Sequence, residues 1–141
     1  MESHLTDIAR VIQLAVAPVF LLTALATMIS ALNTRLGRIV DRRRVVFARS
    51  DSAADAESAG ELDLLARRSR LVYFAIFCVV SAALLVCLVV AGAFLGALLS
   101  VDLARMVAAL FIGAMLAMIA GLSLFLREVY LAVRAGSHNR R

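Results

Sequence analysis

Three long uncharged runs constrain the fold of this chain more than any other feature. No Asp, Glu, Lys or Arg occurs in residues 11–32, 71–99 or 106–126. Each run exceeds the roughly 18 apolar residues that mark a candidate membrane-spanning helix. The chain is 63% hydrophobic with a mean hydropathy of +0.95, against roughly 45–50% apolar residues in soluble domains. We therefore exclude a soluble globule and predict one all-α membrane domain over residues 1–141, with three transmembrane helices in up-down-up order.

The distribution of arginine predicts the orientation of these helices. All 15 basic residues are Arg: nine lie in residues 33–70 and four follow Leu126, whereas only Arg10 and Arg105 lie on the opposite side. Basic residues gather on the cytoplasmic side of membrane proteins. We therefore expect the N-terminus outside, and residues 33–70 and the tail 127–141 in the cytoplasm.

Residues 33–70 favour a helical hairpin that extends the first two membrane helices into the cytoplasm. Apolar residues continue at helical spacing after the first run. Residues 50–60 are small and acidic, which is typical of a turn, and Ser58 and Glu61 have the spacing of a capping box. In the shorter link before the third run, the expected caps are Ser100 or Asp102.

Charge pairs are expected to orient the cytoplasmic helices. Counting along antiparallel helices from the turn places Asp41 level with Arg67 and Arg68. The same counting across the short outer link places Glu128 near Arg70. Partly exposed pairs of this kind contribute about 1 kcal/mol or less each.

Arg42, Arg43 and Arg44 lie just inside the predicted membrane surface. Close to the membrane surface, each basic residue contributes about 1 kcal/mol to the binding of anionic lipid head groups. The simpler interpretation is that these residues fix the topology, and one set of charges can do both. The arginines lack the base-stacking aromatic residues of a nucleic-acid interface, so we expect no nucleic-acid partner.

Polar residues in the first run follow a heptad pattern. They share the a and d positions with Val16 and Phe20, and are Gln13, Thr23, Thr27, Ser30 and Thr34. One interpretation is a polar stripe that faces a pore or a symmetry axis. The other is that the hydroxyl groups bond carbonyls of their own helix and permit close helix packing.

Small residues at four-residue spacing predict helix contacts in the second and third runs. They are Gly92 and Gly96 in the second run, and Ala109, Gly113, Ala117 and Gly121 in the third. Small residues let two backbones approach closely, which favours helix association in lipid. The partner helix can belong to the same chain, to another copy, or to another protein.

The sequence carries no motif of enzymatic or cofactor chemistry. No Asp, Glu, His, Lys or Arg lies inside a run, which argues against a proton pump or an ion-coupled carrier. There is no P-loop and no metal-ligand spacing of Cys and His, and Cys78 and Cys87 are expected to pack as small apolar residues. We therefore expect a non-enzymatic protein without a cofactor.

Three segments carry a resemblance to a known family. They are IQLAVAPVFLL at residues 12–22, NTRLGRIVDR at 33–42 and FLREV at 125–129. The chain resembles the uncharacterised bacterial membrane proteins of domain-of-unknown-function family 2721. The resemblance implies a small bacterial integral membrane protein and implies no activity.

The predicted function is association between membrane helices. The chain would act as a homo-oligomer or as an accessory subunit of a larger membrane complex. The alternative is a passive pore that several copies build around the polar stripe of the first run.

Overall fold

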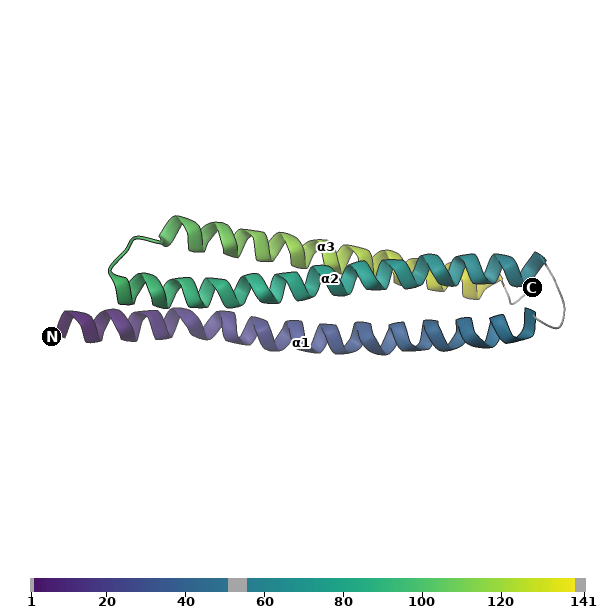
Figure 1. Ribbon diagram of the computed structural model, residues 1–141, viewed down its shortest axis with the longest axis horizontal. Helices are drawn as coiled ribbons and strands as arrows, with labels where there is room; N and C mark the ends of the chain where they lie inside the picture. Colours follow the sequence, from purple (N-terminus) through teal and green to yellow (C-terminus); the bar gives the residue numbers. More distant parts are fainter. Residues whose placement is uncertain (1, 51–55, 139–141) are drawn as a thin grey trace. The chain divides into compact units, whose positions relative to one another are not determined.

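The computed structural model describes residues 2–50 and 56–138, and in these residues it contains three α-helices and no strand. They are α1 (Glu2–Ser50), α2 (Ala56–Leu99) and α3 (Ala104–His138), as Figure 1 labels them. Stretches long and apolar enough to cross a membrane are Ala15–Ala48, Ala59–Leu99 and Ala104–Arg134. The all-α prediction is therefore confirmed, and the chain is a multi-pass membrane protein.

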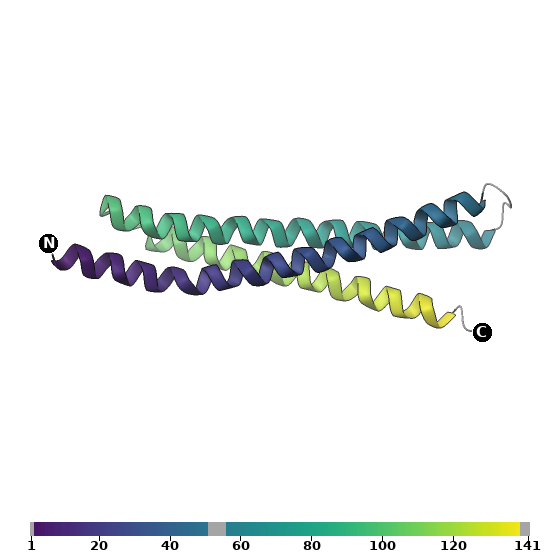
Figure 2. The same ribbon diagram turned by 90° about the horizontal axis from the view of Figure 1, so that it is seen from below.

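The helices extend well beyond the uncharged runs, and each continues without interruption between its bounds (Figure 2). Because α2 already begins at Ala56, Gly60 lies inside the helix and Ser58 is not its N-cap. The prediction of a turn was therefore wrong for residues 56–60, and so was the prediction of a capping box at Ser58 and Glu61. Ala and Glu around Gly60 favour the helix, and one Gly costs only about 1 kcal/mol. The remainder of the predicted turn, residues 51–55, lies outside the described residues.

The link between α2 and α3 is closed by hydrogen bonds at both helix ends. Ser100 has a φ of 53°, and the N–H of Val101 donates to the carbonyl of Gly96 at 3.2 Å. This left-handed residue and six-to-one bond form a Schellman motif at the end of α2. Asp102 Oδ1 accepts the N–H of Ala104 at 3.1 Å, so the predicted cap of α3 is present.

The chain divides into two units, each built from parts of all three helices. The first comprises Met1–Met28 and Cys78–Ile119, and the second comprises Ile29–Phe77 and Ala120–Arg141. The core of the first unit contains Leu25, Val79, Ala82, Val86, Val89 and Ala114. The core of the second unit contains Leu32, Ile39, Val46, Leu65, Val72 and Ala75, together with the polar residues Ser69 and Glu128.

Buried positions recur every seven residues along each helix. In α1 they are Pro18, Leu25, Leu32, Ile39 and Val46; in α2 they include Leu65, Val72, Val79 and Val86; in α3 they are Ala114, Gly121 and Glu128. A seven-residue repeat on a helix of 3.6 residues per turn is typical of left-handed, coiled-coil-like packing. The repeat in α3 therefore places a carboxylate at a core position.

Candidate functional site

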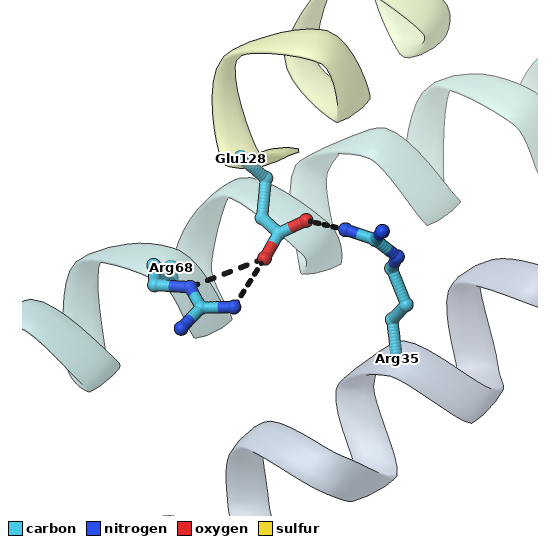
Figure 3. Close-up of polar contacts among 3 residues, drawn as sticks. All are labelled: Arg35, Arg68 and Glu128. Atoms are coloured by element: carbon cyan, nitrogen blue, oxygen red, sulfur yellow. Dashed lines mark hydrogen bonds and ion pairs between the residues drawn. The ribbon is translucent and has the colours of Figure 1, made fainter. Parts of the chain in front are cut away.

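A buried carboxylate joins the three helices of the second unit (Figure 3). The side chain of Glu128, from α3, is 0% exposed. Its Oε2 accepts Arg35 Nη1 of α1 at 2.7 Å. Its Oε1 accepts Arg68 Nε and Nη2 of α2 at 3.1 and 2.9 Å. One side chain thus holds a guanidinium from each of the other two helices.

The position of Glu128 in the repeat explains why it is buried. It lies seven residues after Gly121, on the face that α3 buries. Burying an unpaired carboxylate costs several kcal/mol, so the two arginines are needed to make this position tolerable. Arg35 also lies over the ring of Phe125, 5.0 Å from its centroid, which adds a cation–π contact. Among the described residues, no buried side-chain nitrogen or oxygen lacks a hydrogen-bond partner.

A basic cavity of about 260 Å³ opens beside this cluster. Its lining consists of Arg35, Arg38, Ile39, Arg42, Leu65, Arg68, Glu128 and Ala132, and we call it the arginine pocket. Arg42 pairs at 2.8 Å with Glu61, which is itself partly exposed. Arg38 is exposed and makes no ion pair with any residue of the described ranges. Four guanidinium groups therefore line the pocket, and two carboxylates, Glu128 and Glu61, neutralise only part of their charge.

The predicted pairing of Asp41 with Arg67 and Arg68 was wrong. Arg67 pairs with Asp63 at 3.0 Å, and Arg68 pairs with Glu128. Asp41 is exposed and forms no ion pair within the described part of the chain. It follows buried Ile39 by two residues, which turns its side chain about 200° away from the core face of α1.

Glu128 also has a different partner from the one expected. Arg70 is exposed, whereas Arg68, three residues after buried Leu65, lies on the core side of α2. Arg35 and Arg38 are the pocket arginines that the sequence did not predict, and the uncharged lining residues were not predicted either. The seven-residue spacing from Ala114 through Gly121 to Glu128 is the signal that could have identified the buried acid and its need for basic partners.

The small-residue ladders make contacts within the chain. A Cβ on Gly92 would lie 3.2 Å from Val107 Cγ2, and one on Gly113 would lie 3.6 Å from Leu85 Cδ1. Both glycines therefore lie where α2 packs against α3 in the first unit. Gly96 lies at the end of α2, where an added Cβ would be 3.2 Å from the Val101 carbonyl oxygen. Of the remaining ladder residues, Gly121 is buried, Ala117 is half-buried and Ala109 is exposed.

The predicted polar stripe of α1 is exposed throughout. We call it the α1 polar face, and its members are Gln13, Val16, Phe20, Thr23, Thr27, Ser30 and Thr34. The hydroxyls of Thr23, Thr27 and Thr34 donate to the carbonyls four residues earlier, at 3.3, 3.0 and 2.9 Å. These hydroxyl donors are bonded within the helix, as the second interpretation expects, and the bonds leave the face available for contact with another helix.

The remaining candidate residues lie apart from the pocket. Arg43 and Arg44, neighbours of Arg42 in the predicted lipid contact, are exposed. Cys78 is half-buried and Cys87 is exposed. The described residues contain no group of three or more His, Cys, Asp and Glu side chains placed to hold a metal ion.

Comparison with known proteins gives one family match. A family model described as "Protein of unknown function (DUF2721)" matches residues 15–137. No curated protein and no solved structure matches the chain. The matched range contains every residue that lines the arginine pocket, as well as the small-residue ladders.

Proposed function

The chain belongs to this family of proteins of unknown function, and we propose that it is a non-enzymatic membrane protein that acts by associating with a second copy of itself. The contact is the α1 polar face. The observation that carries the proposal is that this face is exposed along its whole length while α1 buries a different set of residues. Small polar residues at helical spacing let two membrane helices approach closely. Because the threonine donors are bonded internally, the face brings few unsatisfied groups into lipid or into a contact.

The continuation of the α1 polar face supports a second copy as the partner. The same spacing leads from Thr34 to Gly37, Asp41 and Arg44. A Cβ on Gly37 would meet nothing within 4 Å, so the chain itself leaves space there. Two copies inserted in the same direction bring the two α1 helices together in parallel. Asp41 of one copy then lies one turn from Arg44 of the other, and this pair would fix the register.

The proposal also includes the membrane in which the protein lies and the side on which each terminus lies. The Arg count of thirteen against two supports an inner-membrane protein with the N-terminus outside and the C-terminus in the cytoplasm. The ends of α1 and α2 around residues 33–50 and 56–70 then form the cytoplasmic hairpin. An accessory subunit would use the same α1 polar face against another membrane protein.

The mass of the purified protein in a mild detergent tests this proposal. Native mass spectrometry of the full chain is expected to give a dimer. Ser30→Leu places a bulky side chain in the contact and is expected to give a monomer. Ala120→Leu, at an exposed position of α3, is the matched control and should leave the dimer intact. A monomeric wild-type protein, or equal effects of both variants, would contradict the proposal.

A passive pore is the second candidate, because the exposed face carries the polar residues of the span. A pore requires several copies around a shared axis, so its mass would exceed that of a dimer. Liposomes containing the protein should then leak small solutes, and Thr27→Val should change the leak rate without changing the mass. A dimer without leakage would exclude the pore.

A further inference from the structure

The arginine pocket lies at the end of all three uncharged runs. Arg35 follows the run 11–32 by three residues, Arg68 precedes the run 71–99 by three, and Glu128 follows the run 106–126 by two. A membrane helix changes at such points from lipid to water. The pocket is therefore expected at the membrane surface, where phosphate groups of lipids and anions of the solution both have access.

The pocket has more cationic donors than its own acids satisfy. An arginine side chain has five N–H donors. Glu128 engages one nitrogen of Arg35 and two of Arg68, so Nη1 of Arg68 is not used in these bonds. Arg38 donates to no acid in the described part of the chain. With two carboxylates against four guanidinium groups, the lining keeps a net positive charge.

We propose that the arginine pocket binds a phosphate-bearing anion. The planar guanidinium group matches phosphate oxygens with two parallel hydrogen bonds, which a lysine cannot provide. The cavity of about 260 Å³ is slightly below the range of drug-sized sites, about 300–1,000 Å³. It therefore suits a single phosphate or one lipid head group. Glu128 serves as the anchor that holds Arg35 and Arg68 in place, and Arg38 supplies the free charge.

Arg38 offers the clean test, because its replacement breaks no ion pair of the described structure. Replacing Arg35 or Arg68 would leave buried Glu128 without one of its partners, and this loss would destabilise the second unit. Arg70→Gln is the matched control: it removes the same charge near the same end of the uncharged run 71–99, at an exposed position of α2 outside the pocket. Circular dichroism and thermal melting should be unchanged in both variants.

Two probes distinguish the sources of the phosphate group. In one arm, the full-length protein in neutral detergent is titrated with phosphatidylglycerol and, for comparison, with net-neutral phosphatidylcholine, and bound lipid is counted by native mass spectrometry. In the other arm, inorganic phosphate is titrated in a calorimeter. Saturation by phosphatidylglycerol identifies a lipid site, and saturation by inorganic phosphate identifies a site for a free anion.

The proposal predicts saturable binding in at least one arm. Arg38→Gln should weaken that binding about tenfold, the effect of losing one charge-assisted hydrogen bond, and Arg70→Gln should change it less than about twofold. Equal losses in the two variants would mean that surface charge alone attracts the anion. That result, or the absence of saturable binding in both arms, would overturn the proposal. Neither outcome depends on the α1 polar face, so this site and the proposed dimer are tested separately.

Discussion

At the scale of single residues, Glu128 is the most consequential side chain of the second unit. It is a fully buried acid that receives three hydrogen bonds from two arginines, which are themselves 40% and 20% exposed. Replacing such a network with apolar residues is often neutral, whereas removing one member is costly. The network is therefore better regarded as a device that fixes which faces of the helices meet.

Replacing Glu128 with Gln should destabilise the second unit by about 3 kcal/mol, because it leaves two guanidinium groups without their buried counter-charge. Glu61→Gln breaks an exposed pair and should cost about 1 kcal/mol or less. Unfolding in mixed detergent micelles, followed by circular dichroism, measures both values. Equal stabilities of the two variants would show that the Glu128 network contributes no more than a surface pair.

The backbone conformation of Ser100 leads to a second prediction about a single residue. Its φ of 53° lies in the left-handed region, which a side chain disfavours by about 1 kcal/mol and which glycine adopts freely. Ser100→Gly is therefore expected to raise the free energy of unfolding by about 0.5 kcal/mol, once the greater chain entropy of glycine is subtracted. Ser100→Ala should give no gain. A loss of stability in Ser100→Gly would refute the Schellman assignment.

At the scale of the elements, the sequence predicted the three helices and the Asp102 cap but not the faces that they bury. A helix in lipid is apolar all round, so hydrophobicity does not mark its inner face as it does in water. Only the seven-residue pattern of burial distinguishes Ala114, Gly121 and Glu128 from their neighbours. The mispairing of Asp41 has two causes. Counting along helices gives no rotation, and the counted level was also shifted, because α1 pairs with α2 through Arg42 and Glu61 and not at the level of Arg67 or Arg68.

Substitutions at two glycines distinguish helix packing within the chain from contact between copies. Gly92→Leu forces a side chain against Val107, already 3.2 Å from an added Cβ, and should cost about 2 kcal/mol of fold stability. Gly37→Leu meets open space in the chain and should not lower the fold stability, while it should weaken the dimer. Stability and native mass are measured on both variants. A loss of fold stability in Gly37→Leu, with unchanged fold stability in Gly92→Leu, would show that Gly37 packs within the chain and that Gly92 does not.

At the scale of the whole molecule, the arginine distribution predicts one orientation in the membrane. A reporter that functions only in the cytoplasm should be active when it is fused after Ser137. A reporter that functions only outside the cell, fused at the same place, should be inactive. The opposite result would place the hairpin, and with it the arginine pocket, on the outer side.

Disulfide cross-linking between two copies tests whether their α1 polar faces meet. In a background with Cys78→Ala and Cys87→Ala, Thr27→Cys is introduced in one protein and Ala120→Cys in another, both at exposed positions. Membranes are then oxidised and separated without reductant. The protein with Thr27→Cys is expected to form a covalent dimer, and the protein with Ala120→Cys is expected to remain a monomer. A dimer for Ala120→Cys with a monomer for Thr27→Cys would contradict this expectation.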